Sequence, residues 1–418
     1  MKFVIGLDLG TSGLKALSVT SEGAIVHAVS SSYEPSQPYP GWSEQDVSQW
    51  KAALIEVLMR LKRLHGNEWP RLAIGFSGQM HGLICMDHAK RPLAPALLWN
   101  DQRTFIESDE IMKITDGRIV DWTLNESRTA FTASKILWTK KHRPEIWNRT
   151  RKILLPKDYM RFLLSGTYAT DVTDASGTNL LAVHERTWSV KALEALDIPV
   201  ELLPQPYESA EVVGQTGTEL SRSVGLPDGI PLVAGAADQA AAALGMNVVR
   251  PGDMSITLGT SGVVYMQTAA PLLDHSGALH TFCHSVPGTY QLMGGVLSAA
   301  GSAAWLHTVL NEVLAESTTS HHRMSHDTIL AIAERAVPGS DGLLFLPYLT
   351  GERSPYNDPK ARGSWFGLTS RHGLPELCRS VYEGVAFALK DLFVTAKDLG
   401  AQPEVIRLGG GGARGALW

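Results

Sequence analysis

The chain has 418 residues, more than one hydrophobic core usually holds, so its length predicts two domains. Hydrophobic residues make up 44% of it and charged residues 19%, a globular composition that excludes long disorder, collagen-like sequence and coiled coil. The formal net charge of −5 excludes a basic field of the kind that holds a phosphate backbone, so we expect no nucleic-acid partner.

Cysteine usage and apolar runs bear on the compartment. Cys85, Cys283 and Cys378 are far apart and lack metal-ligand spacing, so they predict neither a disulfide framework nor a zinc site. The first apolar run is short and broken by Asp8, and no other run reaches membrane length. We therefore expect a cytoplasmic protein with no membrane partner. The oligomeric state stays open, a homodimer included.

The first hundred residues alternate strand and helix patterns. Apolar alternation over residues 2–8, a Gly-Thr-Ser-Gly turn at 10–13 and a second apolar run at 14–19 predict a β-hairpin. A third strand follows, then apolar residues along one helical face over 47–64, then a short strand over 72–76. This order predicts an α/β fold with a mixed sheet and helices packed on it.

The predicted helix over 47–64 has its own start signal. Asp46 precedes it and Gln49 follows at the spacing of a capping box. Its apolar face is expected to run from Val47 to Leu64.

A five-residue sequence occurs twice. Leu-Gly-Thr-Ser-Gly at 9–13 recurs unchanged at 258–262, each time between two short apolar runs. Chance reuse of turn-forming residues is the alternative, but the shared setting favours one domain type used twice. We therefore predict domains at residues 1–247 and 248–418. Only the first copy follows a carboxylate, that of Asp8.

Each turn offers backbone N–H groups and two hydroxyls, a combination suited to phosphate oxygens. A tight hairpin that needs glycine dihedrals is the alternative for a single copy, whereas two copies favour a grip on one polyphosphate from both sides. The predicted phosphate-binding residues are Gly10, Thr11, Ser12, Gly259, Thr260 and Ser261.

Two charged residues flank the first turn. Asp8 supplies a hard anionic oxygen for Mg²⁺, and Lys15 either supplies positive charge or lies on the solvated face of its strand. The chain contains neither a Walker A sequence nor the motif set of protein kinases. The predicted phosphate site therefore belongs to another architecture.

Two further segments place reactive side chains after predicted strands. Asp238 follows a buried-looking strand over 230–235 and precedes a helix of small residues. An N-cap role for Asp238 is the alternative. Because its neighbours are small, however, a substrate hydroxyl could approach the carboxylate, which would accept the proton as the hydroxyl attacks phosphorus. A second loop combines an amide, a thioether and an imidazole, those of Gln79, Met80 and His81. An ordinary loop histidine is the alternative for His81.

One glycine pattern points elsewhere. Gly410, Gly412 and Gly415 match Gly-x-Gly-x-x-Gly after an apolar run over 405–408, which is a dinucleotide-binding fingerprint. That fingerprint needs a following helix and an acidic residue about 20 positions on, and neither appears before Trp418. A dinucleotide oxidoreductase is therefore the least favoured function class.

Together these residues resemble the FGGY family of carbohydrate kinases over nearly the whole chain. The resemblance is carried by residues 5–13, 77–82, 98–103, 155–159, 171–177, 345–353 and 409–414. The combination is specific, because the glycerol kinases of the family carry a different, arginine-containing sugar loop.

The resemblance implies two actin-like (ribonuclease H-like) ATPase domains with an interdomain cleft, sugar on the first, ATP on the second and Mg²⁺ between. It implies phosphorylation of D-xylulose by ATP, with Asp238 as general base and Asp8 beside the magnesium. The implied sugar contacts are Gln79, Met80, His81, Trp99, Asn100, Asp101, Arg103 and Gln239. The implied ATP contacts are the two turns, Lys15 and an adenosine loop of Gly410, Gly411, Gly412 and Arg414.

The family pattern continues beyond residue 418, and Gly415 replaces its usual serine. We therefore expect an incomplete second domain, a segment 409–418 without packing partners, and ATP binding weaker than sugar binding. The alternatives are a catalytically impaired sugar-binding remnant and a kinase for a related ketopentose or polyol, since Gln239 stands where some relatives have Asn.

Overall fold

The computed structural model describes residues 3–66, 69, 73–317, 323–356, 358 and 360–418. It contains two compact units. Unit 1 comprises Met1–Leu244 and Phe282–Thr289, and unit 2 comprises Gly245–Thr281 and Tyr290–Trp418. The predicted boundary after residue 247 lies close to this division. No pattern in the sequence indicates that residues 282–289 belong with unit 1.

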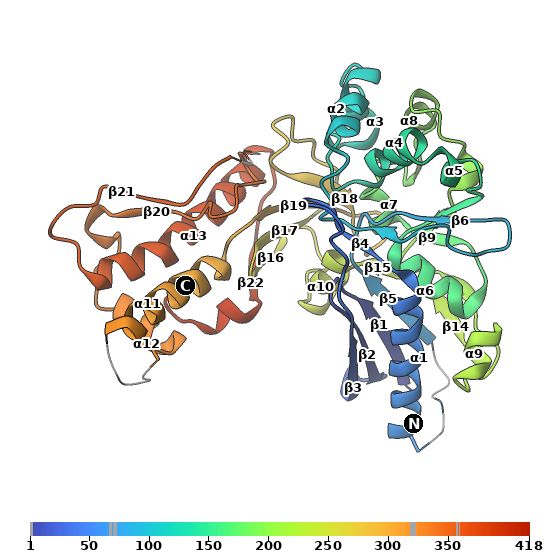
Figure 1. Cartoon of the computed structure of the whole chain (residues 1–418), viewed down its shortest axis with the longest axis horizontal. Coiled ribbons are helices and arrows are strands. Elements are labelled where there is room, and N and C mark those ends of the chain that lie inside the picture. The colour runs from blue at the N-terminus through green and yellow to red at the C-terminus, as the bar shows by residue number, and fades with distance from the viewer. Residues whose placement is uncertain (1–2, 67–68, 70–72, 318–322, 357, 359) are drawn as a thin grey trace. The chain divides into compact units, whose positions relative to one another are not determined.

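Unit 1 is built on a seven-stranded sheet with the order β13-β14-β5-β1-β2-β3, in which β15 also pairs with β5 (Figure 1). The strands are β1 (Phe3–Leu9), β2 (Gly13–Thr20), β3 (Ile25–Ser32), β5 (Ala73–Gly78), β13 (Val212–Gln215), β14 (Pro231–Val233) and β15 (Ala236–Ala237). β1 is antiparallel to β2 and parallel to β5. The predicted hairpin and mixed sheet are confirmed, although Lys2 and Leu72 lie outside the described residues.

Helix α1 (Val47–Leu64) packs on this sheet and closes the main core of unit 1 (Figure 1). Its buried face ends before Leu64, which is 51% exposed, so the predicted apolar face was one residue too long. The predicted capping box is wrong as well. Asp46 does cap the helix, but it accepts from Ser48 N at 2.8 Å, and Gln49 instead accepts from Gln45 Nε2 at 2.8 Å.

The remainder of unit 1 consists of short elements. Its other helices are α2 (Phe105–Ile114), α3 (Ile119–Thr123), α4 (Thr132–His142), α5 (Pro144–Trp147), α6 (Pro156–Ser165), α7 (Val172–Ser176), α8 (Val190–Ala195), α9 (Glu219–Ser223) and α10 (Asp238–Gly245), which ends at the unit boundary. Two-stranded sheets pair β4 (Glu44–Gln45) with β7 (Ala96–Leu97), β6 (Ile84–Met86) with β8 (Lys152–Leu154), β9 (Ala169–Asp171) with β12 (Gln205–Tyr207), and β10 (Leu181–Ala182) with β11 (Thr187–Trp188).

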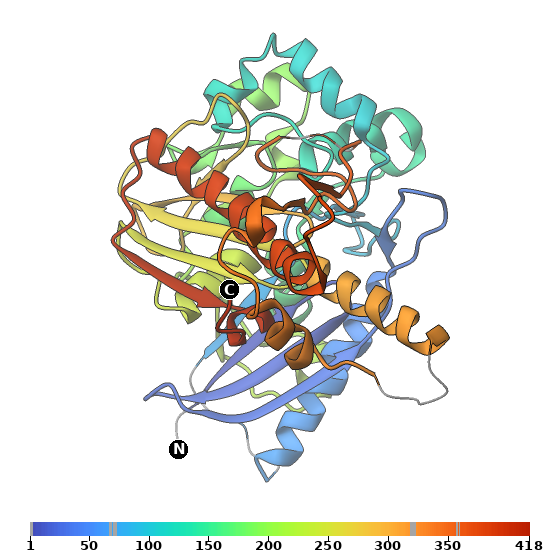
Figure 2. The ribbon, with the colours of Figure 1, turned by 90° about the vertical axis from the view of Figure 1, so that its left-hand side faces the viewer.

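Unit 2 has a five-stranded sheet with the order β18-β19-β17-β16-β22. Its strands are β16 (Asp253–Leu258), β17 (Gly262–Thr268), β18 (His280–Cys283), β19 (Tyr290–Val296) and β22 (Val405–Gly409). Helix α13 (Leu374–Asp398) lies along the sheet and buries Val385, Leu389 and Leu392 against it (Figure 2). The other elements are α11 (Ala300–Ser317), α12 (His326–Ala333), β20 (Leu344–Leu346), β21 (Ser364–Phe366) and the 3₁₀ turns η2 (Ser340–Gly342) and η3 (Gly411–Arg414).

The two sheets share one strand arrangement. In unit 1 a strand β2 lies antiparallel between β1 and β3, and β1 has the parallel neighbour β5. In unit 2 the strand β17 lies antiparallel between β16 and β19, and β16 has the parallel neighbour β22. The repeated pentapeptide forms the first turn in both, at 9–13 and 258–262. The prediction of one domain type used twice is therefore confirmed.

The expectation that residues 409–418 lack packing partners is wrong for the last residue. The Trp418 ring lies edge-on to Tyr382, with ring centroids 5.0 Å apart, and its indole Nε1 donates to the Tyr382 carbonyl at 2.9 Å. Trp418 also packs against the hydrophobic clusters around α13.

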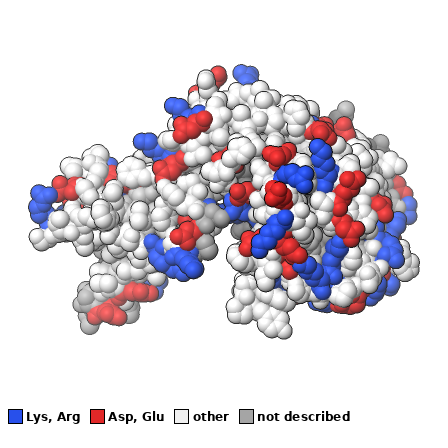
Figure 3. Space-filling model, turned by 90° about the horizontal axis from the view of Figure 1, so that it is seen from above, with Lys and Arg blue, Asp and Glu red and all other residues white. Residues whose placement is uncertain are grey.

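The surface carries charged side chains of both signs, in keeping with the 37 Lys and Arg and the 42 Asp and Glu of the sequence. On the face shown in Figure 3, basic and acidic side chains are interspersed. Within the described part of the chain, no helix has both the length and the apolar character needed to cross a bilayer.

Candidate active site

Three strands of unit 1 end at one edge of the sheet, and each carries a candidate site residue there. β5 is parallel to both β1 and β15, so the carboxyl ends of the three strands coincide. Ser77 pairs in register with Asp8 on one side and with Ala236 on the other. Asp238 follows β15 directly and begins α10. The carboxyl edge is where sheets of this kind place their ligands.

A cavity of about 670 Å³ opens at this edge, a size typical of small-molecule sites. Its polar lining includes Asp8, Lys15, Ser77, Asp238 and Gln239. Most of the remaining lining is small or apolar, including Gly6, Gly75, Gly235, Ala236, Ala241 and Ala242. The cavity thus brings both predicted catalytic carboxylates together with Lys15 and Gln239, and its small residues leave the carboxylates accessible.

The carboxyl group of Asp238 is held near the point of half-ionisation at neutral pH. Burial raises its pKa to about 7, and the negative charge of Asp8 raises it as well. The hydrogen bond that Asp238 Oδ1 accepts from Gln239 N, at 2.7 Å, acts in the opposite direction. A carboxylate with a pKa near the working pH is suited to accept and release a proton.

Asp8 is the candidate ligand for Mg²⁺. Among the described residues, no group of three or more His, Cys, Asp or Glu side chains could hold a metal by itself. Mg²⁺ at a phosphate site usually takes only one or two protein carboxylates, together with phosphate oxygens and water. Asp8, exposed on the cavity and close enough to Asp238 to raise its pKa, fits that requirement.

The predicted sugar loop is folded tightly. His81 has a left-handed backbone, with φ of 68°, and its Nδ1 lies 2.6 Å from the Gly177 carbonyl oxygen. Because a carbonyl only accepts, Nδ1 carries the proton in this tautomer. A Cβ at Gly177 would lie 2.6 Å from that nitrogen and 3.2 Å from Met80 Cε, so only glycine fits there. Met80 and His81 are therefore brought together, each less than a tenth exposed.

Two other predicted sugar residues contact the first phosphate turn instead. Gln79 Nε2 donates to Gly10 O at 3.3 Å, and Thr11 Oγ1 donates to Gln79 Oε1 at 3.4 Å. Trp99 Nε1 donates to Thr11 Oγ1 at 3.0 Å. Gln79 and Trp99 thus shape the turn between β1 and β2. Beside Trp99, the side-chain oxygen of Asn100 is buried with no hydrogen-bond partner among the described residues.

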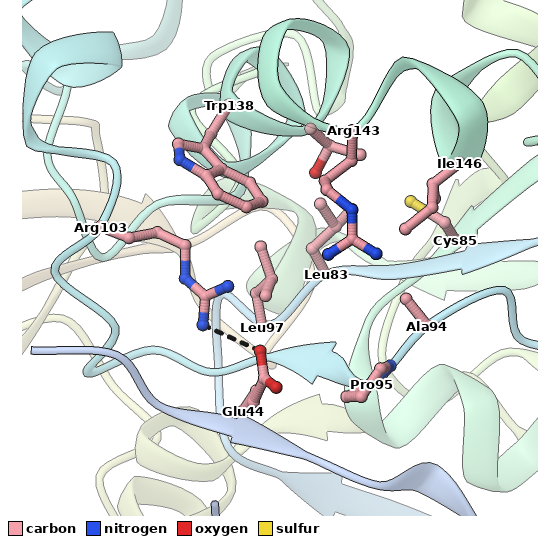
Figure 4. Close-up of a pocket in the computed structure, with 11 residues that line it drawn as sticks. Glu44, Leu83, Cys85, Ala94, Pro95, Leu97, Arg103, Trp138, Arg143 and Ile146 are labelled. Atoms are coloured by element: carbon pink, nitrogen blue, oxygen red, sulfur yellow. Dashed lines mark hydrogen bonds and ion pairs between the residues drawn. The ribbon is translucent and has the colours of Figure 1, made fainter. Parts of the chain in front are cut away.

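Asp101 and Arg103 do not line the cavity at Asp8 and Asp238. Arg103 is buried and forms an ion pair with Asp101 at 2.7 Å. It forms a second ion pair with Glu44 at 3.0 Å (Figure 4). Its guanidinium lies over the Trp42 ring, 3.6 Å from the centroid. Asp101 also accepts from Ser43 N at 2.6 Å. Both side chains therefore brace their segment, and Arg103 lines a separate hollow of about 60 Å³.

The two predicted ATP loops of unit 2 are neighbours. β16 and β22 are parallel with Thr257 opposite Gly409, so the turn at 259–261 and the loop at 410–414 follow at the same edge. Gly410 has φ of 83°, and a Cβ there would lie 2.6 Å from Leu258 O, so the loop needs glycine at this position. The turn at 10–12 and Lys15 belong to unit 1.

Sequence reasoning missed a buried ionic cluster in unit 1. It contains Lys157, Asp158, Arg161, Asp171 and Asp174, whose side chains are all fully buried. The signal in the sequence is three charged residues, Lys157, Asp158 and Arg161, within the otherwise apolar segment 153–164. Charged residues are rarely buried unless they are paired, so such a segment indicates buried ion pairs.

Fold and site together define a class of protein, the two-domain actin-like phosphotransferases that act on small molecules. The chain matches the models for the FGGY family of carbohydrate kinases, the N-terminal domain over residues 3–245 and the C-terminal domain over 254–418. It belongs to that family.

Named relatives agree with this assignment. A xylulose kinase of Escherichia coli is 39% identical over 99% of this chain and 83% of the relative. A xylulose kinase of Lactococcus lactis is 38% identical over 94% of this chain and 76% of the relative. The crystal structure of a "xyloylose kinase" from Brucella ovis superposes with a TM-score of 0.92 at 36% identity, covering 100% of this chain and 83% of that one.

Proposed function

We propose that this protein transfers the γ-phosphoryl group of ATP to D-xylulose and produces D-xylulose 5-phosphate and ADP. The observation that carries the proposal is the carboxyl group of Asp238, with a pKa of about 7, at a cavity of about 670 Å³ that it shares with Asp8. The choice of D-xylulose rests on the relatives named above, which are xylulose kinases.

The residues of unit 1 suggest how the transfer proceeds. A sugar hydroxyl in the cavity donates its proton to Asp238 while its oxygen forms a bond to the γ-phosphorus. The bond from that phosphorus to the bridging oxygen breaks, and ADP carries the electron pair away. Mg²⁺, when bound with ATP, neutralises phosphate charge, and Asp8 would hold it. Lys15, opposite Asp8 in the hairpin, adds positive charge at the same edge.

The remaining assignments follow the resemblance to the family, and that of Gln239 is supported by its place in the cavity lining. Met80, His81 and Gln239 are proposed to bind the sugar, and the turns at 10–12 and 259–261 to bind the phosphates. The loop at 410–414 is proposed to bind the adenosine. We assign sugar binding to residues 1–247 and ATP binding to residues 248–418.

A coupled ADP-release assay tests the proposal. The chain is incubated with Mg·ATP and, in turn, with D-xylulose, D-ribulose, L-ribulose and glycerol, and the phosphorylated product is identified by ³¹P NMR. We expect the highest kcat/KM with D-xylulose. A higher value with another acceptor would reassign the substrate. Binding of D-xylulose without ADP release would favour the catalytically impaired remnant.

A further inference from the structure

A buried chain of polar contacts, one ion pair followed by two hydrogen bonds, ends at the backbone beside Asp238. Lys157 Nζ lies 2.7 Å from Asp171 Oδ1. The other carboxylate oxygen, Asp171 Oδ2, accepts from the Thr173 hydroxyl at 2.6 Å. The Thr173 hydroxyl oxygen in turn accepts from Ala237 N at 2.9 Å. Ala237 is the last residue of β15, so the chain joins α6 and α7 to the residue that precedes Asp238.

The same cluster anchors the preceding segment as well. Arg161 Nη1 donates to the Ala234 carbonyl at 2.7 Å and pairs with Asp158 at 3.0 Å. Asp171 Oδ2 also accepts from Thr173 N at 2.8 Å, which fixes the start of α7. The segment between Ala234 and Asp238 is therefore held at two points by buried side chains of α6 and α7.

The charges of the cluster balance only if one carboxyl group is neutral. Lys157 contacts Asp158 and Asp171 at 2.7 Å and Asp174 at 3.6 Å, and Arg161 adds the second cation. Burial raises the pKa of Asp174 well above its ordinary range, and the nearby carboxylates, Asp238 included, raise it further against the opposing effect of Lys157. With Asp174 protonated, two cations face two carboxylates.

Stability alone does not account for such a cluster. Buried ion pairs are often no better than well-packed apolar side chains of similar volume, because desolvation offsets their attraction. The hydrogen bonds within the cluster are directional, so they restrain the positions of the groups that they join more strictly than apolar contacts do. A reacting group needs that restraint, since a displacement of about 1 Å can cost roughly 100-fold in rate.

We propose that Thr173 is a positioning residue for Asp238, and that its hydroxyl transmits the restraint of the Lys157–Asp171 pair to the backbone that carries this carboxylate. The inference rests on the proposed function, in which Asp238 is the general base. Thr173 is fully buried and hydrogen-bonded to protein groups, so it acts on the reaction only through Asp238.

The chain offers a matched control at Thr216, whose hydroxyl contacts the residue that precedes β14. Thr216 is 1% exposed, donates to Pro227 O at 2.6 Å and accepts from Ile230 N at 2.9 Å. Like the hydroxyl of Thr173, that of Thr216 donates one hydrogen bond and accepts one from a backbone N–H, here that of the residue before β14, although its acceptor is a carbonyl and that of Thr173 is a carboxylate. Thr216→Val therefore reproduces the loss of a buried, doubly bonded hydroxyl away from Asp238.

The experiment compares Thr173→Val, Thr173→Ser and Thr216→Val in the full chain, by steady-state kinetics with D-xylulose and by thermal melting. We expect Thr173→Val to lower kcat by about 10- to 100-fold and to leave the KM for D-xylulose within about threefold. Thr173→Ser, which keeps the hydroxyl, should retain more than half of kcat. Thr216→Val should lower the melting temperature to a similar extent while leaving kcat within about twofold.

Equal kcat values for Thr173→Val and Thr216→Val would overturn the positioning role, as would failure of the serine variant to restore kcat. If Thr173→Val does not fold, Thr173→Ala, which leaves room for water, takes its place under the same criteria. Asp238→Asn is measured in parallel. If that variant keeps more than about a tenth of the rate, the base assignment itself fails, whatever the Thr173 variants show.

Discussion

The replacement of Asp238 by Asn removes the proposed base with the least change of shape. The amide oxygen can still accept from Gln239 N, as Asp238 Oδ1 does at 2.7 Å, so the start of α10 should be preserved. General-base catalysis is typically worth 10²–10⁴-fold, or about 2.7–5.5 kcal/mol of transition-state stabilisation. The carboxylate is one polar contact among several, so affinity for D-xylulose should stay within about tenfold.

Single-turnover measurements with excess enzyme isolate the chemical step from product release. Wild-type protein and Asp238→Asn are mixed with Mg·ATP and D-xylulose, and the reaction is stopped with acid at set times. Sugar affinity is measured separately by calorimetry. Retention of more than about a tenth of the wild-type rate would refute the assignment of Asp238 as general base.

The pKa of Asp238 adds two pH dependences to the same comparison. Because the carboxyl group must be ionised to accept a proton, wild-type activity should rise with pH through about 7, and this limb should be absent from the residual activity of the Asn variant. Stability should change in the opposite direction. A carboxyl group whose pKa is raised on folding binds its proton more tightly in the folded state, so its contribution is lost as pH rises from about 4 to about 7. The Asn variant should therefore gain melting temperature relative to wild type over that range.

Three further predictions concern the sugar loop, the adenosine loop and the buried cluster. His81→Ala should raise the KM for D-xylulose more than it lowers kcat, because a loop imidazole that binds hydroxyls contributes mainly uniform binding; unchanged affinity by calorimetry would return it to an ordinary loop histidine. Gly410→Ala should weaken ATP binding and lower the melting temperature. Gly411→Ala is the control and should lower the melting temperature less, because nothing lies within 4 Å of the added Cβ. Equal melting temperatures of the two variants would contradict this prediction. Lys157→Met should cost about 3–5 kcal/mol of unfolding free energy in urea titrations. The control is Lys141, whose Nζ pairs with Glu110 at the surface, and Lys141→Met should cost at most about 1 kcal/mol. Equal losses for the two variants would contradict this prediction.

The elements that could be predicted from the sequence are those governed by local rules. The hairpin at the N-terminal end follows from strand alternation and a glycine turn, and the repeated pentapeptide identified its counterpart in unit 2 because turn chemistry is set by a few adjacent residues. The position of Asp238 at the start of α10 follows likewise from a short strand and a run of alanines. These features need no knowledge of distant contacts.

The features that escaped prediction depend on partners far along the chain. Gln79 and Trp99 contact Thr11, which precedes them by 68 and 88 residues, and no local pattern specifies that meeting. Arg103 looked available to a substrate, yet Glu44 and the Trp42 ring enclose it. Family resemblance names segments, but only the fold distinguishes side chains that line the cavity, such as Gln239, from those that do not, such as Arg103.

The two units carry different side chains at the corresponding edges of their sheets. In unit 1, Asp8 pairs across the hairpin with Lys15 and across the parallel pair with Ser77. In unit 2 the corresponding position is Thr257, which pairs with Val263 and Gly409. The first edge therefore carries charges that can bind a cation and accept a proton, and the second presents a neutral turn of backbone N–H groups. A carboxylate at Thr257 would repel a polyphosphate that lacks a neutralising cation at that point, so the neutral residue suits the copy proposed to hold ATP. Asp8 and Asp238 share the other copy because the proposed reaction needs both a place for the cation and a base for the hydroxyl.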